Sequence, residues 1–305
     1  MGRALVIGCG GTLGFAWTAA VLTELDRQGW SPGNADVLVG TSAGAELVAR
    51  LGAGVPADDL ELAAAAPGAP GALPPLPRPG LPGLGLTRAA LTGRVDPLAG
   101  LAGLLPRGTG DPQWLVDLGD GLADPATGWV THPDTWLVAA DARTGVRIPF
   151  GRADAPKAPL GRAIAASWAI PGWFPPVRIG GRGYLDGGAV SPTSADLLLP
   201  HVSDGRIDEV LVVAPMSSSG GAPARGLAHV ERLLRRPMTR RVDDEIAALQ
   251  AAGARVHRIE PTADDLAAMG ASFMDAARLD AVRTTAARTA PTLVARRLDR
   301  PEAVR

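Results

Sequence analysis

Short apolar runs alternate with glycine-containing loops and helical patterns over the first part of the chain. Residues 4–7 are all apolar, which is typical of a fully buried strand of a parallel sheet, and a second strand is predicted at 36–39, where three apolar residues follow Asp36. Residues 15–28 carry apolar side chains at helical spacing and stop at Gly29, and residues 45–50 predict another helix. This order of strand, loop, helix, strand, turn and helix predicts a parallel sheet covered by helices.

The remaining pattern predicts two hairpins, one further core strand and several helices. Strands are predicted at 135–140, 146–150, 177–179, 184–185 and 209–214, and helices at 160–168, 225–253 and about 263–298. Residues 67–86 are rich in proline and glycine, so we expect a surface loop or an apolar flap beside the active site. Residues 87–122 predict short helices. We expect one domain over residues 1–305, with the helices from about 225 packed on it.

Composition excludes several classes of function. The 305 residues include 30 lysines plus arginines and 31 aspartates plus glutamates, so no net field favours a nucleic-acid partner. The one cysteine, Cys9, allows no internal disulfide, and the four histidines lack metal-ligand spacing, so we expect no metal and no cofactor. We interpret a group of arginines as the solvated face of a helix, with weak contact to a membrane surface as the alternative. They are Arg232, Arg235, Arg236, Arg240 and Arg241.

The uncharged segment 4–23 has the length of a signal peptide or a membrane span. Its centre contains Gly8, Gly10, Gly11 and Gly14, which would weaken either kind of helix. A buried strand, a glycine loop and a buried helix explain the segment better. Together with the single cysteine, this favours a cytoplasmic location, with peripheral membrane contact as an alternative.

The most informative motif is the pentapeptide Gly40-Thr41-Ser42-Ala43-Gly44, which lies between a predicted strand and a predicted helix. A serine between two glycines at such a junction matches the G-x-S-x-G nucleophile elbow. Gly40 and Gly44 let the backbone turn sharply, and the following helix directs its positive dipole end at developing negative charge. The pattern therefore predicts that Ser42 is a nucleophile, with an ordinary glycine–serine turn as the alternative.

A serine that attacks an ester creates an oxyanion, which needs preorganised hydrogen-bond donors. The glycine loop (residues 8–14) can supply them, because consecutive glycines let backbone N–H groups converge at the start of a helix. Gly10, Gly11 and Thr12 are the expected donors. The competing dinucleotide motif G-x-G-x-x-G fails, since its third glycine would fall at Leu13 and the acidic ribose partner is missing.

The serine also needs a general base. His201, His229 and His257 follow it in chain order, but no local motif marks any of them. Asp186 is better marked, because it ends a short predicted strand and precedes Gly187 and Gly188, which permit close approach to another backbone. An aspartate in a tight turn is the alternative interpretation. The residues alone leave both candidates for the base open.

The order of these motifs resembles the patatin-like phospholipases, in which a glycine loop, a serine elbow and an Asp-Gly-Gly triplet follow one another. Residues 165–176 are similar to the family segment before the aspartate, and residues 190–196 to the segment after it. The resemblance spans residues 4–214, with gaps in the middle. It implies a three-layer α/β/α patatin-like fold with a mostly parallel central sheet.

The resemblance also implies a hydrolase of lipid or other acyl esters, of the phospholipase A or serine esterase type. Ser42 would be the nucleophile and Asp186 its base in a catalytic dyad, with Gly10, Gly11 and Thr12 as the oxyanion hole. Three aromatic residues just before the aspartate are candidates for an acyl pocket, with core packing as the alternative for each. They are Trp168, Trp173 and Phe174.

One position departs from the family pattern. Family members commonly carry arginine or lysine just before the last glycine of the loop, where this chain has Leu13. The backbone donors do not depend on this side chain, so we expect activity on neutral esters at least as readily as on anionic phospholipids. Two alternatives remain at this stage: a non-catalytic lipid-binding or scaffolding protein with the same fold, and a Ser–His–Asp α/β-hydrolase.

Overall fold

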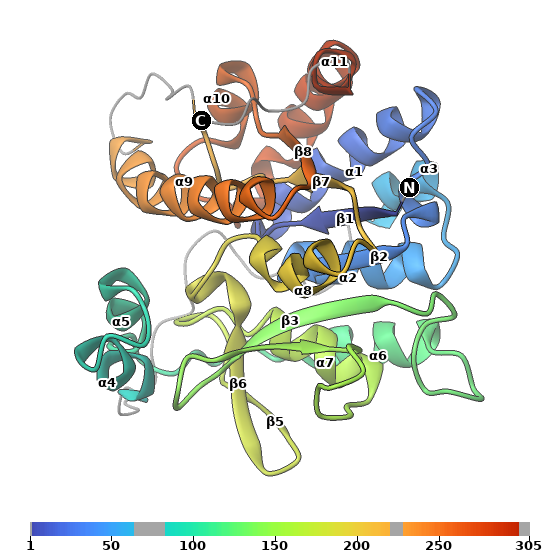
Figure 1. Ribbon diagram of the computed structural model, residues 1–305. Coiled ribbons are helices and arrows are strands. Elements are labelled where there is room, and N and C mark those ends of the chain that lie inside the picture. Colours follow the sequence, from blue (N-terminus) through green and yellow to red (C-terminus); the bar gives the residue numbers. More distant parts are fainter. Residues whose placement is uncertain (1, 64–82, 220–227, 299–305) are drawn as a thin grey trace.

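The computed structural model describes residues 2–63, 83–219 and 228–298. Over these residues the chain folds into a central sheet with helices on both faces (Figure 1). The strands are β1 (Arg3–Ile7), β2 (Val37–Thr41), β3 (Thr135–Asp141), β4 (Arg147–Phe150), β5 (Val177–Ile179), β6 (Arg182–Asp186), β7 (Glu209–Val213) and β8 (Arg255–Ile259). The α-helices are α1 (Gly11–Arg27), α2 (Ala43–Gly52), α3 (Ala57–Ala63), α4 (Gly85–Leu91), α5 (Pro97–Ala102), α6 (Gln113–Leu122), α7 (Leu160–Ser167), α8 (Leu199–Ser203), α9 (Ala228–Ala251), α10 (Ala263–Met269) and α11 (Leu279–Leu298).

The strands that the structure describes form one sheet in the order β5–β6–β3–β2–β1–β7–β8, with β4 paired to β3. β1 pairs in parallel with β2 and with β7, and the same direction continues to β3 on one side and β8 on the other. β4, β5 and β6 run antiparallel to their neighbours. The predicted α/β/α fold with a mostly parallel central sheet is confirmed.

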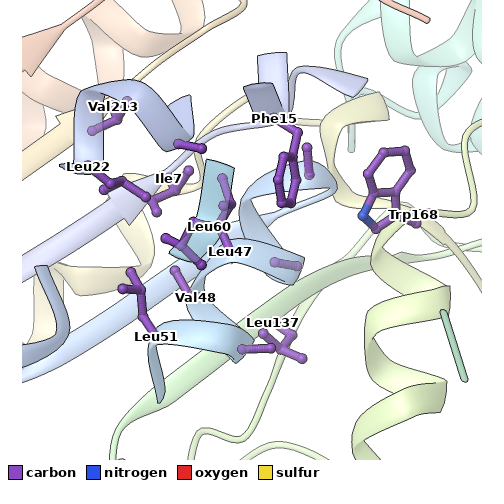
Figure 2. Packing of buried hydrophobic residues seen from close by; sticks show 14 of the residues in the cluster. Ile7, Phe15, Leu22, Leu47, Val48, Leu51, Leu60, Leu137, Trp168 and Val213 are labelled. Atoms are coloured by element: carbon purple, nitrogen blue, oxygen red, sulfur yellow. The ribbon is translucent and has the colours of Figure 1, made fainter. Parts of the chain in front are cut away.

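Alternation along the central strands divides the apolar side chains between two cores. Leu5 and Ile7 of β1 face the core that α1, α2, α7 and α11 cover, whereas Ala4 and Val6 face the core beneath α9. Figure 2 shows how part of the first core, including Ile7, packs beside the elbow helix α2. Because both faces of these strands are buried, their sequences are nearly continuous apolar runs.

Three predictions of secondary structure need correction. The first helix begins at Gly11 rather than at residue 15, inside the glycine loop. The helix expected over 263–298 is interrupted, because a non-helical segment separates α10 from α11. Strand β8 was not predicted, since charged side chains interrupt its pattern. Most of the proline-rich segment 67–86 lies outside the described residues, and its last two residues begin α4.

The arginines of α9 do not form one solvated face. Arg235 is buried and donates hydrogen bonds to the carbonyl oxygens of Pro215 and Ser217. Arg241 pairs with Asp196 and with Glu245. The interpretation of this group as a purely solvated face was therefore wrong at Arg235, whose charge helps to hold the chain that follows β7.

Candidate active site

Ser42 lies at the sharp turn between β2 and α2, with a backbone φ of 58° and ψ of −122°. Such a conformation is strained for a residue with a Cβ, and it persists only where the surrounding structure enforces it. A Cβ at Gly40 would stand 2.3 Å from the carbonyl oxygen of Gly44, and a Cβ at Gly44 would stand 2.1 Å from that of Ile7. Glycine is therefore required on both sides of Ser42, as the elbow motif predicted.

Ser167, at the end of α7, holds the backbone of the elbow. Its Oγ accepts a hydrogen bond of 2.8 Å from the N–H of Ser42 and donates one of 2.6 Å to the carbonyl oxygen of Val138 in β3. Both bonds are buried, so this hydroxyl connects the strained turn to the adjacent strand. Ser167 lies in the segment before the aspartate, but no motif in the sequence indicates this role.

The register of the sheet brings the ends of β2 and β6 together. On one edge of β3, β2 ends with Thr41 opposite Val138. β6 runs along the same edge from the opposite direction and ends with Asp186 opposite Ala139, while β4 occupies the other edge. The last residues of β2 and β6 thus face consecutive residues of β3. Because Ser42 directly follows Thr41, the nucleophile candidate and Asp186 meet at this point.

The carboxyl group of Asp186 is buried, with 4% of the residue exposed. One of its oxygens accepts a 2.7 Å hydrogen bond from the N–H of Gly188, and the side chain of Ser42 lies near enough to lower the pKa of the carboxyl by hydrogen bonding. Burial raises the pKa of Asp186 to about 7, although both hydrogen bonds act to lower it. A carboxyl with such a pKa exchanges protons near neutral pH, as a general base requires.

The glycine loop lies against the same point. A Cβ added at Gly188 would stand 2.9 Å from the Sγ of Cys9, so the loop and the residues after Asp186 are in contact. Among the described residues, no carbonyl oxygen accepts a hydrogen bond from the N–H groups of Gly10, Gly11 or Thr12. These three amides, at the N-terminus of α1, are available to an anion.

A segment far along the chain covers this loop. The N–H of Leu13 donates a 3.0 Å hydrogen bond to the carbonyl oxygen of Phe273, and a Cβ at Gly11 would stand 2.5 Å from side-chain atoms of Phe273 and Met274. We call residues 271–275 the covering loop. It interrupts the helical pattern between α10 and α11, and nothing in its local sequence marks its position over the glycine loop. The side chain of Leu13 is fully buried in the first core.

The residues after Asp186 form a support loop (187–196) that is fastened to α9. The carboxylate of Glu245 accepts hydrogen bonds from the hydroxyls of Ser191 and Thr193 and from the N–H of Ala195. The same loop supports the glycine loop, because the carbonyl oxygen of Pro192 accepts a 2.8 Å hydrogen bond from the N–H of Cys9. Glu245 therefore stabilises both sides of the candidate site from a helix that the motifs do not include.

The three aromatic residues proposed for an acyl pocket lie in different surroundings. Trp168 is buried in the first core (Figure 2), and its ring lies edge-on to that of Trp114. Trp173 is partly buried and its ring lies 5.8 Å from that of Phe273 in the covering loop. Phe174 lines a cavity of about 830 Å³ that lies between α4, the β3–β4 turn and β6. The lining of this cavity includes Leu185, the neighbour of Asp186.

The histidines whose side chains are described have other partners. His132 contacts the carbonyl oxygen of Ala35, and the ring of His201 lies edge-on to Trp136. His257 lies on β8, at the far edge of the sheet, and contacts Glu209. The side chain of His229 is outside the described residues. None of the described contacts joins a histidine to Ser42.

Comparisons with known proteins agree with the fold described above. The chain has a patatin-like fold, and residues 124–199 match the family model described as patatin-like phospholipase. This match includes Asp186 but not the elbow. The crystal structure of VipD from Legionella pneumophila is similar over 98% of this chain and 67% of that chain, with a TM-score of 0.51 and 12% sequence identity. No match was found among curated proteins.

The resemblance to patatin-like phospholipases that the sequence motifs indicated is therefore confirmed, and the family match supports lipid acyl hydrolysis as the general class of activity. Within residues 2–63, 83–219 and 228–298, no helix combines the length and the apolar character that a membrane span needs.

Proposed function

We propose that the protein is a serine acyl hydrolase that cleaves lipid carboxyl esters, of the phospholipase A or esterase type, through Ser42 and Asp186. The observation that carries the proposal is the meeting of the two strand ends, which joins the Ser42 side chain to a buried carboxyl with a pKa of about 7. An aspartate at its ordinary pKa would be too weak a base to deprotonate a serine, and burial makes it a stronger base by raising its pKa.

In the proposed reaction, the Asp186 carboxylate takes the hydroxyl proton as the Oγ of Ser42 attacks the ester carbonyl carbon. The N–H groups of Gly10, Gly11 and Thr12 stabilise the oxyanion, helped by the positive end of α1. When the tetrahedral intermediate collapses, Asp186 returns the proton to the leaving alcohol and the acyl group stays on Ser42. Water, deprotonated by Asp186, then releases the acid by the same steps.

Treatment with a fluorophosphonate, followed by peptide mapping, tests the nucleophile. We expect covalent labelling of Ser42, and none of the Ser42→Ala variant. Ser194→Ala is a matched control, because Ser194 is also buried and has a positive φ of 57°, yet its hydroxyl has no hydrogen-bond partner among the described residues. If the folded protein is not labelled at Ser42, the acyl hydrolase proposal is wrong and a lipid-binding role takes its place.

Substitution of the base separates the two enzymatic mechanisms. Asp186→Asn should abolish ester hydrolysis, whereas His201→Ala, His229→Ala and His257→Ala together should leave most of it. Loss of activity in the histidine variant, with its fold intact by circular dichroism, would instead support a Ser–His–Asp hydrolase.

A further inference from the structure

Exposed large apolar side chains are concentrated on one small part of the described surface. Six large apolar residues have exposed fractions between 39% and 83%, and five of these six lie on or beside α4 and α5. They are Leu84, Leu91, Leu101, Leu104, Leu105 and, in the adjacent β3–β4 turn, Val146. Single exposed leucines are ordinary, but a cluster of them marks an interaction site. Figure 1 shows α4 and α5 at the margin of the molecule.

The same surface is positively charged. Five arginines and a single acidic residue, Asp141, line the cavity beside α4, and the arginines are Arg88, Arg94, Arg107, Arg143 and Arg182. Arg182 lies 3.8 Å from Asp141, whereas the other four form no ion pair with any described residue. These four arginines therefore pair with no carboxylate of the described residues, in contrast to Arg241 of α9.

Close contacts fix α4 and α5 on the body of the protein. A Cβ at Gly85 would stand 2.0 Å from the carbonyl oxygen of Ala142, and one at Gly145 would stand 2.4 Å from Val95. The leucines and arginines thus have a fixed position relative to β6. Because the cavity that they border reaches Leu185, this surface adjoins the strand that carries Asp186.

We propose that the surface formed by α4, α5 and the β3–β4 turn docks on a bilayer that contains anionic lipid. The leucines would enter the boundary between head groups and acyl chains, while the arginine side chains reach the lipid phosphates. An anionic bilayer offers both features that this surface requires, because arginines close to its surface are strongly attracted and its interior is apolar. A protein partner would need a face that is both apolar and acidic. The proposal complements the proposed function, because esters of membrane lipids are held in such a bilayer, but docking does not require catalysis.

Sedimentation with sucrose-loaded vesicles tests docking separately from hydrolysis. The full-length Ser42→Ala protein is mixed with vesicles of phosphatidylcholine alone or of equal parts phosphatidylcholine and phosphatidylglycerol. One variant removes three arginines (Arg88→Ala, Arg94→Ala, Arg107→Ala) and another removes three exposed leucines (Leu91→Ser, Leu101→Ser, Leu104→Ser). The matched control removes three exposed arginines from other surfaces, namely Arg27, Arg206 and Arg288, each changed to alanine.

We expect binding to the anionic vesicles, weakened by added salt, and little binding to phosphatidylcholine alone. Each arginine near an anionic surface contributes a factor of about five, so the arginine variant should bind about 100-fold more weakly. The leucine variant should also lose binding, and the control should keep it. Circular dichroism shows whether each variant is folded.

Three results would overturn the proposal: no sedimentation with anionic vesicles, equal binding by the arginine variant and its control, or equal binding by the leucine variant and the parent protein. Light scattering completes the test. If the leucine variant splits an oligomer while vesicle binding is unchanged, the surface is a contact between copies of the chain and not a membrane-docking site. None of these results depends on whether Ser42 is labelled by a fluorophosphonate.

Discussion

Replacement of Asp186 by asparagine should remove activity and, at neutral and alkaline pH, make the protein more stable. The wild-type carboxyl is buried, and charging it there is unfavourable enough to raise its pKa from 3.8 to about 7. Asparagine has nearly the same shape and keeps an oxygen that can accept the hydrogen bond from the N–H of Gly188. The main change is therefore the loss of a buried negative charge.

The size of the effect follows from the two pKa values. A shift of about three units corresponds to roughly 4 kcal/mol of unfolding free energy. Between about pH 4 and about pH 7 the folded state binds more protons at Asp186 than the unfolded state, so wild-type stability falls as the pH rises through this window. Asparagine does not titrate. The stability gain of Asp186→Asn should thus be small at about pH 4 and reach roughly 4 kcal/mol by about pH 8.

Urea unfolding followed by circular dichroism measures this difference across the pH range. Asp141→Asn is the control, because Asp141 is also buried but lies 3.8 Å from the guanidinium of Arg182, so neutralising it removes a favourable charge interaction and should not stabilise the protein. In parallel, wild-type ester hydrolysis should rise about tenfold per pH unit below about pH 7 and then level off. A stability difference that does not change with pH, or a less stable variant at about pH 8, would refute the reasoning.

Three further predictions concern residues that position the site. Ser167→Ala leaves the N–H of Ser42 without its buried acceptor, so kcat should fall about tenfold or more and the free energy of unfolding by about 1–3 kcal/mol; an unchanged kcat would remove Ser167 from the account. Gly11→Ala should lose ester hydrolysis because its Cβ would collide with the covering loop, whereas Gly29→Ala, also at positive φ but with nothing within 4 Å, should lose only about 1 kcal/mol of stability. Glu245→Gln should destabilise the protein by about 2–4 kcal/mol and lower kcat, since a neutral amide cannot accept the same hydrogen bonds from the hydroxyls of Ser191 and Thr193. An unchanged kcat with a lowered Tm would limit Glu245 to a structural role.

The strands were predictable where burial on both faces left a local signature. β1, β2 and β7 consist almost entirely of apolar residues, because each of their faces meets a core. β8 lacked this signature. Its Arg258 is buried, and it is accommodated by ion pairs with Asp243 of α9 and with Glu260, which directly follows β8. In the sequence, a charged residue indicates an exposed position, and the ion pairs that neutralise Arg258 carry no local signature, so the strand was not predicted.

The candidate site was predictable in its motifs but not in its supports. Gly40 and Gly44 identify the elbow because no other residue fits their close backbone contacts. The hydrogen bond from Leu13 to Phe273 and the bonds of Glu245 to the support loop join residues far apart in the chain. No periodicity or short motif records such pairs. Long-range contacts of this kind are visible only once the sheet and its covering helices are assembled.

Leu13 concerns the charge of the glycine loop alone, and not that of the surface around the site. Because its apolar side chain departs from the family pattern, we expect neutral esters to be cleaved at least as readily as anionic phospholipids. In the structure that side chain is fully buried, and its N–H is bonded to Phe273, so the backbone of the glycine loop is held without a charged group. Arg88, Arg94 and Arg107 place positive charge on the surface next to the strand that carries Asp186. If that surface docks on anionic bilayers, these arginines bring the protein to the membrane, whereas the ester is bound at an uncharged glycine loop. The substrate can then have a neutral head group even though the surrounding membrane is anionic.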